Sequence, residues 1–213
     1  MSQGQSVDRI QALSVAQSLV TVLTPVTERI AIAGSLRRLR PKVRDIELVA
    51  MPRIEERPAH DLWASPETHD LLEERIAEML SASAVYARLV ENHRADGSID
   101  LQTKLGPSFK ALICDNVNVD LFIVRPPATW GCIYALRTGP GDWNTRLVTD
   151  CKAIGRRVEG GQVQRWDGKA WVVVPTPEER DFFAALGQRW VEPEERAVER
   201  VRIDRPIADG VRA

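Results

Sequence analysis

Two short apolar segments, residues 45–51 and 117–124, carry carboxylates at positions that strand geometry would bring to one surface. Alternate side chains of a strand share a face and lie about 6.6 Å apart. Asp45 and Glu47 therefore point the same way, and Asp120 lies on the face opposite its apolar neighbours. If the two segments pair as neighbouring strands, the three acids converge at one sheet edge.

Three carboxylates at one edge repel one another unless cations neutralise them. Magnesium prefers oxygen ligands and usually shares them with substrate phosphates. Two such ions about 4 Å apart can stabilise the attacking and leaving oxygens of an in-line displacement. A tight Gly34-Ser35 turn, which suits a triphosphate, lies eleven residues before Asp45. Together these features predict nucleotidyl transfer with two Mg²⁺ ions, for which Mn²⁺ could substitute.

Each feature also has an ordinary structural explanation. Strand alternation alone places Asp45 and Glu47 toward solvent, and Gly-Ser pairs mark loops in many proteins. Asp120 is harder to explain in this way, because an acid within an apolar strand needs an exposed face or a partner. The joint spacing of the turn, Arg38 and the acids favours function.

Composition limits the partners and the compartment. The 213 residues carry a formal net charge of −1, which excludes strong, diffuse attraction to nucleic acid. The three cysteines form no CxxC pair, and no apolar run is long enough for a membrane span. We therefore expect a cytoplasmic protein without a disulfide framework or a membrane partner. Basic residues gather in two patches: Arg37, Arg38, Arg40, Lys42 and Arg44, and then Lys152, Arg156, Arg157, Arg165 and Lys169, where solvated surface is the favoured interpretation of the second.

Hydrophobic periodicity and turn residues predict the elements of the first part of the chain. A helix is expected to start at Asp8 and to end before Pro25. Another is expected to start at Ser65-Pro66, with Ser65 as its cap, and Asp115-Asn116 predicts a hairpin turn. Strands are predicted at about residues 30–33, 45–51, 109–114 and 117–124.

Arg125-Pro126-Pro127 is the predicted boundary between two subdomains. Beyond it, a helix is expected from an Asp142 cap to Gly155, and Asp167-Gly168 predicts a second hairpin. Thr176 and Pro177 predict a capped helix that runs to about Gly187. A short helix and a loose tail are expected after Val191.

The motifs Gly34-Ser35-Leu36-Arg37-Arg38, Asp45-Ile46-Glu47 and Val119-Asp120-Leu121-Phe122-Ile123-Val124 resemble those of the X-family DNA polymerases, the polymerase-beta-like nucleotidyltransferases. Thr138-Gly139, Asn144 and Gly155 continue the resemblance. Residues 175–196 look like the family's closing thumb helix and its proline-glutamate tail. The similarity runs in order over about residues 28–200.

This resemblance implies an α+β fold. A nucleotidyltransferase palm, a mixed β-sheet flanked by helices, would occupy residues 1–125. A small α/β thumb that closes on the nucleotide would occupy residues 126–200, and a tail would follow over 201–213. The implied partners are a nucleoside triphosphate, a DNA primer-template or gapped DNA, and a ligase or another DNA-repair protein.

The resemblance also implies the roles of individual residues. Asp45 and Glu47 would bridge both metals, and Asp120 would bind the ion that activates the 3′-hydroxyl. The implied substrate-binding residues form a larger set. Ser35 and Arg38 would hold the β- and γ-phosphates, Thr138-Gly139 would lie against the sugar, Asn144 would touch the base, and Gly34, Arg37 and Trp143 complete the set.

The sequence departs from the family in several places. Glu47 replaces the usual aspartate, Leu136-Arg137 replaces two aromatics that help exclude a ribose 2′-hydroxyl, and Asn118 replaces a basic residue. The family's lyase domain and DNA-clamping hairpins are not recognised. Two alternatives therefore stay open: transfer to RNA, a small molecule or a protein hydroxyl, and a non-catalytic nucleotide- or DNA-binding module.

Overall fold

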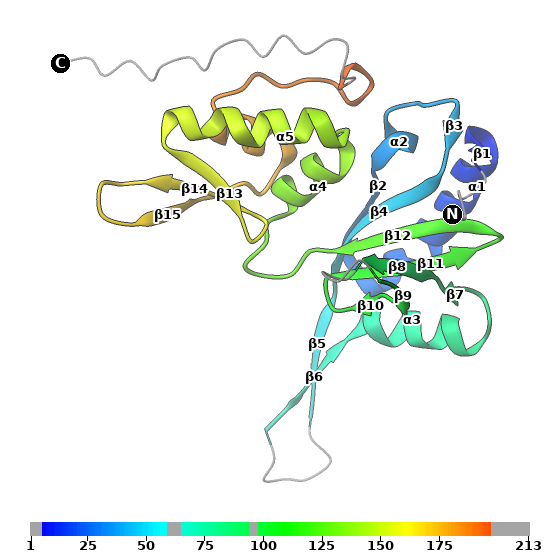
Figure 1. Cartoon of the computed structure of the whole chain (residues 1–213). Coiled ribbons are helices and arrows are strands. Elements are labelled where there is room, and N and C mark those ends of the chain that lie inside the picture. The colour runs from blue at the N-terminus through cyan, green and yellow to red at the C-terminus, as the bar shows by residue number, and fades with distance from the viewer. Residues whose placement is uncertain (1–5, 59–64, 94–97, 197–213) are drawn as a thin grey trace. The chain divides into compact units, whose positions relative to one another are not determined.

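The computed structural model describes residues 6–58, 65–93 and 98–196 (Figure 1). The chain forms two compact units. The first consists of residues 1–32 and 40–123, and the second of residues 33–39 and 124–213. The division after Ile123 lies close to the predicted boundary at residues 125–127. Residues 33–39, which carry the Gly-Ser turn, group with the second unit and not with the first.

A mixed sheet organises the first unit, as the sequence predicts. Its strand order is β10-β11-β12-β4-β2, and β7 pairs with β11. Only β12 and β4 run parallel, whereas the other neighbours are antiparallel. The strands are β2 (Thr27–Ile32), β4 (Asp45–Pro52), β7 (Tyr86–Ala87), β10 (Leu105–Gly106), β11 (Phe109–Cys114) and β12 (Val117–Ile123).

Helices α1 (Arg9–Leu23) and α3 (Leu71–Ser81) contact β4 of this sheet. The predicted start of α1 is confirmed, because the Asp8 carboxylate accepts a hydrogen bond from Ile10 N at 2.8 Å. The predicted helix start at Ser65 is wrong. Residues 67–70 instead form a strand that pairs with residues 54–57, and Asp70 caps α3 by accepting from Glu73 N at 2.9 Å.

The predicted hairpin between β11 and β12 is confirmed. Asp115 and Asn116 have φ angles of 47° and 61°, the left-handed region that the tightest two-residue hairpin turns need. Three further pairs complete the first unit: β1 (Val7–Asp8) with β3 (Lys42–Val43), β5 (Ile54–Arg57) with β6 (Glu67–Asp70), and β8 (Leu89–His93) with β9 (Ile99–Thr103).

The second unit combines short helices with a three-stranded antiparallel sheet, β13-β14-β15. Its buried core includes Trp143, Leu147, Val163, Phe182 and Phe183. The elements are α2 (Gly34–Arg37), α4 (Trp130–Thr138), α5 (Gly141–Asp150), η2 (Cys151–Ile154), β13 (Arg156–Glu159), β14 (Gln162–Trp166), β15 (Trp171–Val174), α6 (Glu179–Ala185) and η3 (Pro193–Glu195).

Two predicted helix starts in this unit are wrong by a few residues. Pro140, not Asp142, precedes α5, and Asp142 lies in its first turn. The box that caps α6 is formed by Glu178 and Asp181. Thr176 does not cap α6: its hydroxyl pairs with Thr129 Oγ1 at 2.6 Å and its carbonyl accepts from Gly131 N at 3.1 Å, both at the start of α4. Gly155 does end its helical segment, with a φ of 67°.

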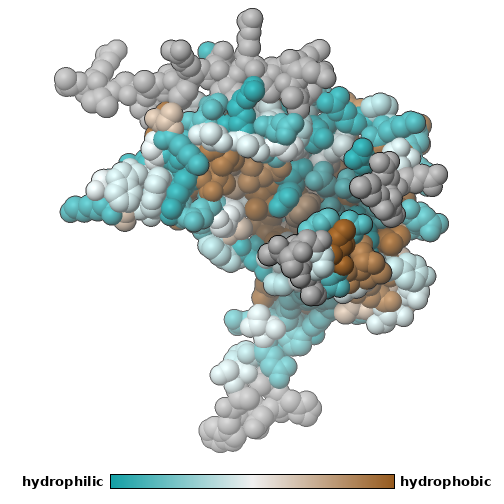
Figure 2. Space-filling view, viewed as in Figure 1, coloured by the Kyte–Doolittle hydropathy of each residue, from teal (hydrophilic) through white to brown (hydrophobic). Residues whose placement is uncertain are grey.

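The β8–β9 pair exposes apolar side chains in the first unit. Leu89, Ile99 and Leu101 are each more than half exposed, and hydrophobic residues are visible over these strands in Figure 2. Among the described residues, no helix combines the length and hydropathy that crossing a bilayer requires. The predicted tail at 201–213 and the Asp96-Gly97 turn lie outside the described residues.

Candidate active site

The parallel pairing of β4 and β12 brings the predicted carboxylates together in the first unit. Asp120 lies directly opposite Glu47, and Asn118 lies opposite Asp45. Paired residues on neighbouring strands project to the same face of a sheet. Along both strands the acids are partly exposed, whereas the intervening Ile46 and Val119 are buried. The register therefore places the three acids on one face of the sheet, on two inner strands and not at its edge.

Arg88, which the sequence analysis did not single out, engages the third acid. Its backbone N–H donates to Ala111 O at 2.9 Å, so it lies beside β11. Ala111 pairs with Asp120 on the neighbouring strand, and its small side chain leaves room across that position. The Arg88 guanidinium forms an ion pair with the Asp120 carboxylate, and the two side chains are 18% and 17% exposed. Asp120 thus has the partner that an acid in an apolar strand needs.

The donor set at this face fits a hard divalent cation by chemistry, since it consists of carboxylates. In the described part of the chain, however, no three His, Cys, Asp or Glu side chains lie close enough to hold a metal ion. The Asp120 carboxylate is held by Arg88 in an ion pair.

The predicted Gly-Ser turn lies in the second unit. Gly34 has a φ of 61°, a conformation that glycine adopts without the steric cost other residues would meet. Ser35 follows it within α2 and is half-buried. The Arg38 guanidinium donates to the Thr138 carbonyl oxygen. The turn and the last turn of α4, both predicted to bind substrate, are therefore linked by a hydrogen bond within one unit.

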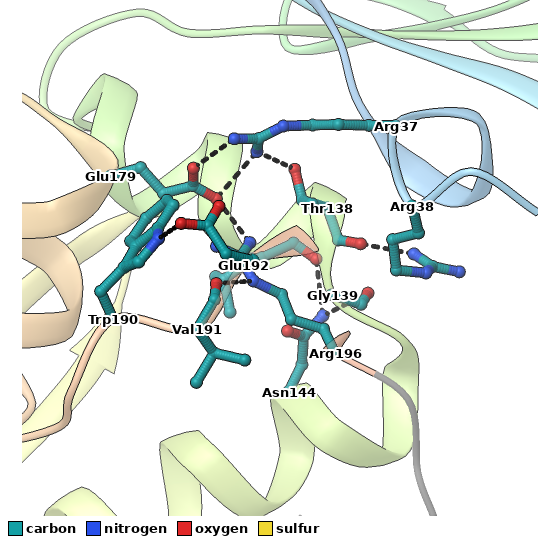
Figure 3. A network of polar contacts seen from close by, with 11 residues as sticks. Arg37, Arg38, Thr138, Gly139, Asn144, Glu179, Trp190, Val191, Glu192 and Arg196 are labelled. Carbon is teal, nitrogen blue, oxygen red and sulfur yellow. Dashed lines mark hydrogen bonds and ion pairs between the residues drawn. The ribbon is translucent and has the colours of Figure 1, made fainter. Parts of the chain in front are cut away.

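Arg37 was predicted to bind substrate, but its guanidinium contacts protein side chains. Its guanidinium binds both carboxylate oxygens of Glu179, at 2.9 and 2.7 Å (Figure 3). It also donates to Thr138 Oγ1 at 2.7 Å and lies 4.0 Å from the centroid of the Tyr134 ring. A bidentate pair of this kind fixes the guanidinium plane. Arg37 thus positions the turn, and its donors are directed at protein atoms.

Glu179 is the centre of this network, although the sequence indicated it only as a helix-start residue. Its side chain is 7% exposed, and it also accepts from Arg196 Nη1 at 2.6 Å. Arg196 is fully buried, and its Nε donates to Val191 O at 2.9 Å. Burial lowers the pKa of the Arg196 guanidinium, and the neighbouring Glu179 opposes that shift. One carboxylate therefore holds two arginines from distant parts of the sequence.

Two other predicted substrate-binding residues have structural roles. Trp143 is buried in the core of the second unit, with its ring centroid 5.7 Å from that of Phe183. The Asn144 amide donates to Leu136 O at 2.6 Å and to Gly139 O at 3.0 Å, which satisfies carbonyls at the end of α4. Trp143 therefore packs in the core, and its predicted contact with substrate stays a prediction. The Asn144 side chain, which belongs to α5, therefore caps the end of the preceding helix α4.

Comparison with known proteins identifies part of this chain. Residues 134–197 match the family model described as DNA polymerase beta thumb. No protein in the curated set matches the chain. The matched range contains Glu179, Arg196 and the three-stranded sheet, and it ends before residues 198–213. For this region, the match supports a relationship to the thumb of X-family DNA polymerases.

Proposed function

We propose that this protein is a magnesium-dependent nucleotidyltransferase that adds nucleotides to the 3′-hydroxyl of a DNA primer and releases pyrophosphate. The observation that carries the proposal is the register of β12 on β4, where Asp120 lies opposite Glu47 on the face that also holds Asp45. The thumb match over residues 134–197 supports DNA as the acceptor. A chain with a net charge of −1 has few sites that could bind the phosphates of a long duplex, so short gaps are the substrates that suit it.

Asp45, Glu47 and Asp120 would hold the cations. Bound there, two Mg²⁺ ions would supply charge stabilisation for the attacking and leaving oxygens. Asp120 must first exchange Arg88 for the cation, so the side chains rearrange on loading. Glu47 is one methylene longer than aspartate, so its carboxylate would lie further from its strand than an aspartate carboxylate would.

Ser35 and Arg38 would bind the triphosphate from the second unit. Arg38 already orients toward the end of α4 through the Thr138 carbonyl, and Gly34 supplies the left-handed turn that begins the motif. Fixed donors of this kind stabilise charge that develops on phosphate oxygens. Arg37 would contribute indirectly, by holding Thr138 and Glu179 in place.

The experiment is primer extension on a labelled gapped duplex with each deoxynucleotide and Mg²⁺. We expect added nucleotides with the wild-type protein and none with Asp120→Ala. Glu78→Gln, which changes an exposed acid of α3, is the matched control and should keep full activity. Extension by Asp120→Ala at the wild-type rate would contradict the assignment of the acids.

The same assay separates the acceptors and the sugar. Parallel reactions contain ribonucleotides, an RNA primer, or labelled ATP with no polynucleotide. Leu136 packs against the core of the second unit, so no aromatic ring is present at that position to exclude a 2′-hydroxyl. We therefore expect ribonucleotides to be incorporated at a rate within about tenfold of deoxynucleotides, which corresponds to about 1.4 kcal/mol. No product on any primer with either sugar would reject the proposal.

A further inference from the structure

One face of the three-stranded sheet in the second unit carries two tryptophans side by side. Trp166 on β14 pairs with Trp171 on β15, and their ring centroids are 5.5 Å apart. The next alternate pair on that face is Gln164 with Val173, and Gln164 pairs with Arg157 on the other side. We call this surface the tryptophan face; it consists of Arg157, Gln164, Trp166, Trp171 and Val173.

The tryptophan face is open along its length, whereas the opposite face of the same sheet is buried at Val163 and exposed at Val172. Trp166 is 47% exposed, Trp171 37% and Val173 46%. Val163, on the opposite face, is fully buried in the core. Figure 1 shows the β14–β15 hairpin extending away from α4 and α5 of its own unit. A contiguous patch of exposed aromatic and apolar side chains is typical of an interaction site, whereas single scattered apolar residues are not.

A cross-strand tryptophan pair also stabilises a hairpin, which would account for the two rings. It does not account for the arrangement of Arg157. This guanidinium lies 4.4 Å from the centroid of the Trp171 ring, and its Nε donates to Gln164 at 2.7 Å. Its Nη2 also pairs with Glu159 at 2.7 Å. Gln164 and Glu159 therefore hold this flat cation against the Trp171 ring, so the guanidinium offers its own plane for stacking.

The charge around the tryptophan face favours a polyanion. Five basic and two acidic residues lie between positions 152 and 174, although the whole chain carries a net charge of −1. Arg165 and Lys169 are exposed at the end of the hairpin. Asp167 accepts from the backbone N–H groups of Lys169 and Ala170, at 2.8 Å each, so its carboxylate is used within the turn. In Figure 2 the end of this hairpin is pale and is flanked by hydrophilic residues.

We propose that the tryptophan face binds unpaired nucleotides of a single strand. Bases would stack on Trp166 and on the Arg157 guanidinium that lies over the Trp171 ring. Phosphates would lie near Lys169 in the turn, whereas Arg165 alternates to the opposite face of the sheet. Stacking on aromatic rings combined with basic residues along the backbone is how single strands are held without sequence preference. A second copy of this chain would bring the same positive surface against itself, which like charges oppose. An acidic peptide lacks the flat groups that the two rings fit.

The test is fluorescence anisotropy of a labelled oligothymidine with the full-length protein at low salt, with EDTA and without nucleotide. We expect Trp166→Ala/Trp171→Ala to weaken binding by about tenfold or more, because one stacked base contributes about 1–3 kcal/mol. Trp166→Phe/Trp171→Phe keeps two flat rings and should lose about threefold or less. The phenylalanine variant also keeps the cross-strand pair, so it separates stacking from hairpin stability.

Charge is tested with Lys169→Glu. This variant should bind about fivefold more weakly and should lower the slope of log affinity against log salt by about one. The matched control is Arg165→Glu, which changes the net charge equally but on the opposite face of the same sheet. The control should bind within about twofold of wild type.

Three outcomes would overturn the proposal. One is equal affinity of all four variants for the oligothymidine. Another is an equal loss in the charge variant and its control. The third is a dimer in sedimentation velocity that Trp171→Ala dissociates, which would make the face a contact between copies. Because no metal or nucleotide is present, binding should persist in Asp120→Ala, and failure of primer extension would leave this result unaffected.

Discussion

Arg88 and Asp120 form an ion pair on the sheet face that also carries Asp45 and Glu47. The guanidinium reaches Asp120 from beyond β11, across the small side chain of Ala111. A fixed positive charge therefore lies where the proposed function calls for a divalent cation. Arg88 satisfies the partly buried carboxylate, and under the proposed function it would compete with a divalent cation for it.

Replacing Arg88 should strengthen metal binding. Arg88→Met removes the competing cation while keeping an extended side chain, so we expect the dissociation constant for Mn²⁺ to fall about tenfold, or about 1.4 kcal/mol. Arg88→Lys keeps the charge and should remain near wild type. Titration calorimetry without nucleotide measures both constants. Weaker Mn²⁺ binding by Arg88→Met would show that the arginine supports the metal site instead of competing with it.

Neutralising Glu179 should destabilise the second unit. Glu179→Gln leaves the fully buried Arg196 and the largely buried Arg37 without their shared carboxylate. Breaking a buried pair by removing one partner costs about 3–5 kcal/mol. Urea unfolding followed by tryptophan fluorescence measures the loss. Glu192→Gln, which keeps an oxygen that can accept from Trp190 Nε1 and removes an exposed charge with only a minor influence on Arg196, is the matched control and should cost about 1 kcal/mol or less.

A methyl group at position 139 should disturb the end of α4. A Cβ on Gly139 would lie 2.7 Å from the Trp143 ring and would also collide with the Asn144 side chain. We expect Gly139→Ala to cost about 1–3 kcal/mol, because the core residue and the capping amide must both move.

Gly141→Ala provides the control, since a Cβ there meets nothing within 4 Å and the position starts helix α5. It should be neutral, or stabilising by up to about 1 kcal/mol. Thermal unfolding of both variants tests the prediction. Equal melting temperatures for Gly139→Ala and Gly141→Ala would contradict the predicted clash at position 139.

Cys132 should make stability fall at high pH. Burial raises the pKa of its thiol to about 12, from 9.0. The unfolded chain therefore loses this proton first, and the folded state is favoured fully only below about pH 9. Between pH 9 and 10.5 we expect this thiol to remove about 2 kcal/mol of unfolding free energy.

Urea unfolding across that pH range tests this prediction. Cys132→Ala is less stable at neutral pH but should lose about 2 kcal/mol less than wild type on going to pH 10.5. The native protein should also react slowly with a thiol reagent at pH 8, since Cys114, Cys132 and Cys151 are all buried. A pH profile of Cys132→Ala parallel to that of wild type would contradict the assignment.

Local sequence patterns predicted the elements well where a turn or cap acts alone. Asp8 caps its helix, and Asp115-Asn116 forms the hairpin, because each depends on neighbouring backbone groups. Predictions failed where a distant partner intervened. Residues 67–70 form a strand because residues 54–57 pair with them. The Thr176 carbonyl accepts a hydrogen bond from Gly131 N, and Thr176 does not cap α6.

The candidate site divides in the same way. Alternation along two strands was enough to predict that Asp45, Glu47 and Asp120 share a face, because side-chain direction in a strand follows directly from sequence position. Trp143 and Arg37 were predicted to bind substrate, yet one is in the core and the other is held by Glu179. Their roles depend on residues far away in the chain, and sequence spacing carries no information about such contacts.

The amino-acid sequence by itself determined the strands that carry the acids, the hairpin turn beside them and the face on which the acids lie, because these follow from backbone geometry over a few residues. Only the tertiary structure decided which charges meet: Arg88 with Asp120, and Arg37 and Arg196 with Glu179. Ion pairs between distant segments form when folding brings a carboxylate out of water beside a guanidinium, since burying either charge alone is costly. Which arginine pairs with which carboxylate therefore depends on the packing of distant segments and not on local sequence.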